Sequence, residues 1–278
     1  MANQKVAIVT GSSSGIGLET AIDLAKNGFK TYATMRNTNK SDEIQQRSQS
    51  ENLPVEIVQL DVNDDASVNN AINTIIEKEG QIDVLVNNAG FATVGAAEEV
   101  SIDEIKNQFE TNVFGVIRTI QAVLPVMKKQ DQGRIINISS GAAFVGTPWM
   151  SAYNSSKGAL ESFTETLRKE VATFGIKVSL VQPGLTKTNG VHAMKVAKKS
   201  QDPNSSYAEL AANTQKTMEK MMENADSPKV VANEILKAAT DDDPAIRYTA
   251  GSVATQLLQA RQSKSDPEFE KFLQELFT

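Results

Sequence analysis

The stretch "VAIVTGSSSGIGLETAIDLAKNG", residues 6–28, contains an apolar run, a cluster of glycines and a segment of helical period. Glycines permit a tight turn and let the backbone come close to a ligand. A helix that follows such a turn directs its free N–H groups and its positive dipole end toward the same point. The stretch therefore predicts a strand, a turn and a helix that bind a pyrophosphate, and a turn without a ligand is the alternative. The residues assigned to this site are Gly11, Ser14, Gly15, Ile16 and Gly17.

The rest of the chain repeats this alternation of short apolar runs and helical segments. The apolar runs lie at 6–10, 30–35, 55–62, 83–90, 134–139, 177–184 and 246–251. Candidate helices lie at 16–27, 41–50, 65–79, 101–129, 152–174 and 228–240. Strands that alternate with helices predict a parallel α/β sheet with helices on both faces, here with about seven strands. Since no linker or repeat divides the chain, we expect one domain over residues 1–278.

Two segments depart from the alternation. Residues 185–227 are polar, rich in lysine and too long for an ordinary connection, so we expect a lid with short helices over a site. The tail, residues 252–278, predicts two short helices, and the second begins at the "DP" of residues 266–267.

Composition excludes several classes of chemistry. The 278 residues include no cysteine and a single histidine, so disulfides, thiolate catalysis and multi-histidine metal sites are excluded. The net charge of -6 disfavours nucleic acid as a partner. The sequence shows neither a signal-peptide pattern at its start nor an apolar run of about 18 residues, which predicts a cytoplasmic protein without a membrane span.

The end of the second apolar run, "TYATMRN" at 31–37, indicates which dinucleotide is bound. An acidic residue at this point would bind the ribose 2′-hydroxyl of NAD. The chain instead has Met35 at that position and Arg36 after it, and a guanidinium suits a 2′-phosphate by charge and geometry. Ser14 could add a hydroxyl to the same phosphate. The prediction is NADP(H), and the alternative is an ordinary surface arginine.

The third run ends in "LDVND" at 60–64. The Asp61 carboxylate could accept a hydrogen bond from the adenine amino group, with help from the Val62 backbone. The alternative is a helix start at this point, because Asn63 and Asp64 are both good N-caps.

Tyr153 and Lys157 lie four residues apart and therefore on one face of a predicted helix. A nearby ammonium favours the phenolate, so we expect Lys157 to lower the pKa of Tyr153 and make it an efficient proton donor and acceptor. Ser140 ends a predicted strand 13 residues before Tyr153, where open α/β sheets place ligands. The alternative is an amphipathic helix with a half-exposed aromatic ring and a solvated lysine.

These motifs together resemble the short-chain dehydrogenase/reductase family over about residues 5–190. The resemblance rests on the glycine turn, "NNAG" at 87–90, Asn112, Ser140, Tyr153 and Lys157, and "TYATMR" is similar to its steroid and retinol dehydrogenase branch. It implies a Rossmann-type doubly wound sheet, hydride transfer, and a homo-dimer or homo-tetramer. It implies that Ser140, rather than Ser139, contacts the carbonyl oxygen of the substrate. It also implies that Lys157 binds the nicotinamide ribose hydroxyls and that Asn112 takes part in a proton relay. A buried, satisfied asparagine is the alternative for Asn112.

The resemblance also implies further contacts. Asn88, Ala89 and Gly90 would pack on the adenosine ribose, and Pro183, Gly184, Thr186 and Thr188 would fold over the nicotinamide, unless "PGLTKT" is a plain turn. The candidate substrate pocket comprises Ser140, Phe91, Thr93, Ala142, Phe144, Val145, Trp149, Met150, Leu185, His192 and Met194. Most of these are apolar, which predicts a carbonyl or alcohol substrate with a hydrophobic body. Lys187, Lys195, Lys198 and Lys199 could attract an anion or form a solvated face.

The sequence thus predicts hydride transfer between NADP(H) and a small-molecule carbonyl or alcohol. A catalytically silent NADP(H)-binding sensor or scaffold is one alternative, and an epimerase or lyase with the same fold is another.

Overall fold

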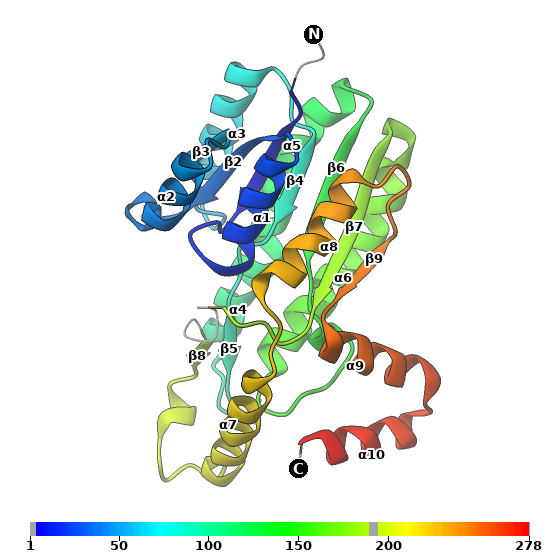
Figure 1. Ribbon diagram of the computed structural model, residues 1–278. Coiled ribbons are helices and arrows are strands. Elements are labelled where there is room, and N and C mark those ends of the chain that lie inside the picture. Colours follow the sequence, from blue (N-terminus) through cyan, green and yellow to red (C-terminus); the bar gives the residue numbers. More distant parts are fainter. Residues whose placement is uncertain (1–3, 189–193, 278) are drawn as a thin grey trace.

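The fold is a parallel sheet covered by helices on both faces, seen in a computed structural model that describes residues 4–188 and 194–277 (Figure 1). The strand order is β3-β2-β1-β4-β6-β7-β9, and every neighbouring pair is parallel. The order confirms the predicted Rossmann-type, single-domain fold. The strands are β1 (Val6–Thr10), β2 (Lys30–Met35), β3 (Val55–Gln59), β4 (Val84–Asn87), β6 (Gly133–Ile138), β7 (Ile176–Pro183) and β9 (Arg247–Ala250).

Two hydrophobic layers hold the helices on the sheet. On one face lie α1 (Gly15–Lys26), α2 (Asp42–Ser50) and α8 (Pro228–Thr240), which bury Leu18, Ile22, Ile44 and Ile235. On the other lie α3 (Asp65–Glu79), α5 (Gly115–Lys129) and α6 (Ser151–Val171), which bury Ile72, Ile120 and Leu160. Strands covered on both sides are buried along their whole length and mostly apolar, as β1 and β4 are.

Local sequence signals set the helix boundaries. Asp64 caps α3 by accepting a hydrogen bond from Ser67 N–H at 2.6 Å, and Gly80 ends it in the left-handed conformation at φ 72°. Ser101 and Glu104 form a capping box at the start of α4 (Ile102–Phe109). Each cap satisfies backbone groups that a helix end leaves unpaired.

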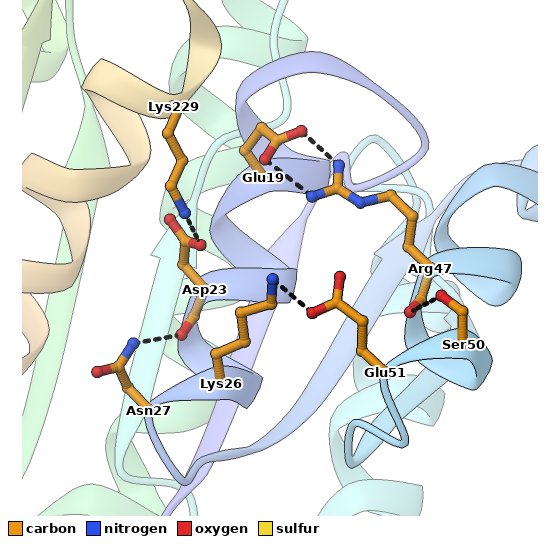
Figure 2. A network of polar contacts seen from close by, with 8 residues as sticks. All are labelled: Glu19, Asp23, Lys26, Asn27, Arg47, Ser50, Glu51 and Lys229. Atoms are coloured by element: carbon orange, nitrogen blue, oxygen red, sulfur yellow. Dashed lines mark hydrogen bonds and ion pairs between the residues drawn. The ribbon is translucent and has the colours of Figure 1, made fainter.

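Polar contacts tie α1 to both of its neighbours (Figure 2). Glu19 pairs with Arg47 of α2, Lys26 pairs with Glu51 at 2.5 Å, and the buried Asp23 pairs with Lys229 of α8. The Arg47 guanidinium lowers the pKa of Glu19 through its hydrogen bond and its charge. These contacts hold the helix whose N-terminus follows the glycine turn.

Two features of the fold differ from the sequence-based expectation. The helix expected at 101–129 consists of α4 and α5 joined by a π-helical turn, Glu110–Phe114. A second, two-stranded sheet pairs β5 (Ala92–Val94) with β8 (Met194–Val196), and these three-residue strands are too short to show a period in the sequence. Short 3-10 turns lie at Thr38–Lys40, Gly141–Ala143, Ala172–Phe174 and Lys199–Gln201.

The lid and tail extend beyond the carboxyl edge of the main sheet, at the bottom of Figure 1. The lid contains α7 (Ala208–Glu223), a longer helix than the short ones expected. The tail forms α9 (Ser252–Ser263) and α10 (Asp266–Phe277), as predicted. In the parts of the chain that the structure describes, no helix has the length and apolarity to cross a bilayer.

Candidate active site

A cleft of about 910 Å³ lies along the carboxyl edge of the main sheet. Its lining includes residues just after β1, β2, β4, β6 and β7, together with residues of the lid and of α9. The strand order reverses between β1 and β4, and open α/β sheets bind their ligands at such a switch point.

The glycine turn forms one end of the cleft and leaves no room for side chains. Gly11 and Gly15 have φ of 70° and 59°, in the region that favours glycine. A Cβ on Gly17 would lie 2.4 Å from the Gly11 carbonyl oxygen and 2.5 Å from Asn88 Nδ2. Gly17 does not line the cleft; it lets α1 pack against the turn. The exposed backbone and the N-terminus of α1 fit a pyrophosphate.

Hydrogen bonds fix the loop after β4 to this turn. Asn88 Nδ2 donates to the carbonyl oxygens of Thr10, at 2.9 Å, and Gly11, at 3.2 Å. Thr10 Oγ1 accepts from the backbone N–H groups of Asn88 and Ala89, both at 3.0 Å. The "NNAG" segment therefore positions the glycine turn as well as lining the cleft with Asn88, Ala89 and Gly90.

Ser14, Arg36, Asp61 and Val62 line the cleft; Arg36 directly follows β2, and Asp61 and Val62 lie shortly after β3. The Arg36 side chain is exposed, and no ion pair involves it among the described residues. Asp61 accepts a hydrogen bond from Asn63 N–H at 3.0 Å, while Asp64 caps α3. Asp64 is therefore the N-cap that the alternative interpretation named, while Asp61 precedes the helix and lines the cleft.

Ser140, Tyr153 and Lys157 line the cleft together. Ser140 follows β6, and its Oγ accepts a hydrogen bond from Ala142 N–H at 3.1 Å, which leaves the hydroxyl proton to donate elsewhere. Lys157 is buried on α6 and donates from Nζ to the Ile138 carbonyl oxygen at 2.7 Å. Its Nζ lies 5.8 Å from the centroid of the Tyr153 ring.

The electrostatics of this group differ from the expectation. Burial raises the pKa of Tyr153, and a side-chain hydrogen bond with Ser140 opposes that rise with a smaller effect. Burial also lowers the pKa of Lys157 to about 8, against the attraction of Glu161. The expectation that Lys157 lowers the pKa of Tyr153 is thus wrong for the polypeptide itself, because desolvation dominates both groups.

Asn112 lies behind the cleft, on the π-helical turn, where it is fully buried. Its Oδ1 accepts from Phe91 N–H at 3.2 Å, and its Nδ2 donates to the Phe91 carbonyl at 3.0 Å and to Ser156 Oγ at 3.2 Å. Ser156 Oγ in turn donates to the Tyr153 carbonyl at 2.7 Å. This chain of bonds joins the segment after β4 to the first turns of α6. The side chain of Asn112 is satisfied, as the alternative interpretation holds.

Most other predicted residues also line the cleft. These are Ile16, Phe91, Ala142, Val145, Met150, Pro183, Gly184, Leu185, Thr186, Thr188 and Met194. Phe144, Trp149 and Thr93 do not: Phe144 packs on the tail helices, and Trp149, at φ 73°, accepts a hydrogen bond from Gly95 N–H. His192 lies outside the described residues.

Part of the lining was not predicted from the sequence. It includes Met218, Met221 and Met222 of α7, Val253 and Leu257 of α9, and Asn107 and Thr111 near the π-helical turn. The three methionines recur at positions i, i+3 and i+4, which places them on one face of a helix. That spacing was visible in the sequence.

The strand order, the glycine turn and the cleft at the switch point define a dinucleotide-binding α/β protein. The model of the short chain dehydrogenase family matches residues 5–199. The chain belongs to this family, whose members are oxidoreductases that act on alcohol and carbonyl groups with nicotinamide cofactors.

Relatives extend the match to nearly the whole chain. The chain is 37% identical over 254 residues to the oxidoreductase YusZ of Bacillus subtilis (strain 168), and the aligned residues cover 90% of each chain. It is 35% identical to a 3-ketodihydrosphingosine reductase of Bacteroides thetaiotaomicron, over 93% of this chain and 92% of that one. It is 41% identical over 184 residues to human retinol dehydrogenase 8, over 65% of this chain and 58% of that one. The resemblance to the retinol dehydrogenase branch is confirmed.

Solved structures share the fold. A short-chain dehydrogenase from Streptomyces avermitilis superposes with a TM-score of 0.84 at 32% identity, over 98% of this chain and 97% of that one. A Burkholderia phymatum homologue in complex with NAD has a TM-score of 0.80 at 25% identity, over 94% and 92% of the chains. A Burkholderia cenocepacia gluconate 5-dehydrogenase in complex with NADP and tartrate has a TM-score of 0.74 at 25% identity, over 91% and 95%. The neighbours thus include structures with either cofactor.

Proposed function

We propose that the protein is an NADP(H)-dependent reductase of ketones or aldehydes with a hydrophobic body. The observation that carries the proposal is that Ser140, Tyr153 and Lys157 line the same cleft as the glycine turn. Two relatives are named for 3-ketodihydrosphingosine and for retinol, compounds with a long apolar body, which supports the same substrate class.

The roles follow from the contacts of each side chain. The bound NADPH would supply a hydride. Tyr153, kept protonated by burial, donates a proton to the carbonyl oxygen, and the Ser140 hydroxyl donates a hydrogen bond to the same oxygen. Lys157 keeps N–H groups for the nicotinamide ribose beside its bond to Ile138. The Asn112 side chain is used to hold Phe91 and α6 in position. Its backbone carbonyl is therefore the group that would take part in a relay of protons to solvent.

Tyr153→Phe tests the reaction. We expect the variant to bind NADPH with unchanged affinity and to lose turnover by at least about 100-fold, since proton transfer by a positioned side chain contributes about 10²–10⁴-fold. Absorbance of NADPH measures consumption across a panel of ketones, aldehydes and alcohols. An active phenylalanine variant contradicts the role of Tyr153.

The same panel separates the alternatives. NADPH binding without consumption by the unaltered protein supports a sensor or scaffold. Conversion of substrate without a net change in NADPH supports an epimerase or lyase.

Preference for NADP(H) rests on the exposed guanidinium of Arg36, which lines the cleft as Ser14 does. Arg36→Leu should weaken NADPH binding by about 10- to 100-fold, because a hydrogen bond to a charged group is worth about 1.5–3 kcal/mol. NADH is the internal control, and its affinity should stay constant. An unaltered protein that binds NADH as well as NADPH contradicts this preference.

We also propose that the chain forms a homo-dimer or homo-tetramer through α5 and α6. Phe114, at the junction of the π-helical turn and α5, is 49% exposed in the single chain, which supports a contact there. Light scattering of the unaltered protein and of Phe114→Glu measures it, and a monomeric unaltered protein contradicts it.

A further inference from the structure

The cleft has few charged side chains, and they are unevenly placed. Arg36 and Asp61 lie at the end proposed for adenosine, and Lys157 lies next to the Tyr153 ring. The remaining charged residue of the described lining is Lys195, on β8 in the lid. No acidic residue lines the cleft beside it, so this part of the wall is positive.

The backbone and one aromatic ring fix the place of Lys195. β8 pairs with β5 so that Lys195 stands opposite Thr93. Its Nζ lies 4.5 Å from the centroid of the Phe91 ring, which also lines the cleft. Such a cation–π contact holds the ammonium without neutralising it. No carboxylate forms an ion pair with Lys195 in residues 4–188 and 194–277.

The other lysines of the lid differ from Lys195. Lys187, Lys198 and Lys199 are exposed, as Lys195 is, but they do not line the cleft. They form the solvated face that was the alternative to an anion site, and they provide matched controls. Lys195 alone among these four lysines contributes to the cleft wall.

Apolar side chains from two helices also line the cleft. α7 contributes Met218, Met221 and Met222, and α9 contributes Val253 and Leu257. Figure 1 shows the two helices on opposite sides below the carboxyl edge of the sheet. Methionine side chains are flexible and polarisable, so they adapt to apolar bodies of different shape.

We propose that the substrate is an amphiphile, a carbonyl compound that carries a carboxylate, and that Lys195 binds this carboxylate. Its apolar body lies between the methionines of α7 and the apolar residues of α9, while its carbonyl oxygen reaches Tyr153 and Ser140. The inference rests on the proposed function and narrows it. It adds no chemical step, since the carboxylate does not react.

The experiment compares matched substrates on matched variants. The substrates are keto acids of increasing chain length, the corresponding neutral primary amides, and the corresponding ammonium compounds. The variants are Lys195→Met, which keeps the length of the side chain without its charge, and the controls Lys198→Met and Lys199→Met. Rates follow NADPH absorbance, and fluorescence quenching measures the dissociation constant of NADPH.

We expect the unaltered protein to prefer acids over amides, and amides over ammonium compounds, at a chain length that spans the cleft. Lys195→Met should raise KM for the acids by roughly tenfold, as for a lost hydrogen bond to a charged group, and leave the amides unchanged. The two controls should behave as the unaltered protein. Added salt should weaken the preference, because Lys195 remains partly in contact with solvent.

Three results would overturn the inference. An equal loss on acids and amides would show that Lys195 supports the lid, and a weakened affinity for NADPH would show that it binds a cofactor phosphate. Reduction of neutral ketones without any preference for acids would refute the carboxylate site and leave the proposed function intact. If the unaltered protein binds NADPH but reduces no carbonyl compound of either panel, the proposed function itself fails.

Discussion

The two ends of the cleft are built in different ways. At the cofactor end, Thr10, Gly11 and Asn88 are bonded to one another, and Gly17 has no space for one more carbon atom. At the substrate end, α7 has no buried residue, and β5 and β8 pair over three residues each. The comparison indicates that the cofactor is held by a rigid frame, whereas the substrate meets a wall that can adjust.

The largest effect should come from adding one methyl group to the rigid end. Gly17→Ala places a Cβ at 2.4 Å from the Gly11 carbonyl oxygen, so the turn must move. Overpacking costs about 1–3 kcal/mol, and we expect NADPH affinity to fall by up to about 100-fold. Fluorescence quenching by NADPH gives the dissociation constant, and circular dichroism reports the fold.

Gly146→Ala is the matched control, because a Cβ at Gly146 meets nothing within 4 Å. It should leave NADPH affinity within about twofold. If Gly17→Ala binds NADPH as well as the control does, the turn is not a rigid frame and the contrast between the two ends fails.

The same contrast explains what the sequence could predict. Buried strands leave apolar runs and helices leave periodic patterns, so all seven strands of the main sheet and the glycine turn were predicted from the chain alone. A strand end and a helical spacing pointed to Ser140, Tyr153 and Lys157, the resemblance to the family selected Ser140 over Ser139, and all three line the cleft. Gly17 and Asn112 were assigned to the site, yet both act from behind it by packing and hydrogen bonding.

The substrate end was harder to predict because tertiary contacts determine it. Nothing local shows that residues 92–94 pair with residues 194–196, about one hundred positions later. Phe144 and Trp149 are apolar residues near Tyr153 in the sequence, but Phe144 packs on the tail helices, and the Trp149 backbone carbonyl accepts a hydrogen bond from Gly95, just after β5. The direction of the Tyr153 pKa shift was missed for the same reason, since desolvation depends on the whole surrounding fold.

A smaller effect, on the pH dependence of stability, should report how strongly Lys157 is desolvated at the rigid end of the cleft. Burial lowers the pKa of Lys157 from its usual value of 10.5 to about 8, so between these pH values the unfolded chain binds a proton that the folded chain does not. Stability therefore rises with pH across this window, by at most about 1.4 kcal/mol per pH unit from this group. Below pH 8 both states are protonated and the contribution is constant.

Lys157→Met isolates this contribution, because the other titrating groups are the same in both proteins. Urea denaturation at pH 7, 8, 9 and 10 gives the free energy of unfolding of each. Above pH 8, the free energy of unfolding of the unaltered protein should increase relative to that of the variant. A difference that does not change with pH would mean that water reaches Lys157 and that this end of the cleft is not desolvated.

The smallest effect should come from the adjustable end. Met221→Leu with Met222→Leu keeps the volume and apolarity of the α7 face but removes rotatable bonds. Because α7 has no buried residue, the melting temperature should change by less than about 2 °C, and NADPH affinity should not change. Values of kcat/KM across substrates of different shape should spread by a further roughly 3- to 10-fold, as a stiffer wall discriminates more.

Lys220→Ala, exposed on the same helix, is the control that should change neither quantity. A marked loss of thermal stability in the methionine variant alone would show that α7 is held as firmly as the glycine turn, and the two ends of the cleft would then differ in chemistry but not in rigidity.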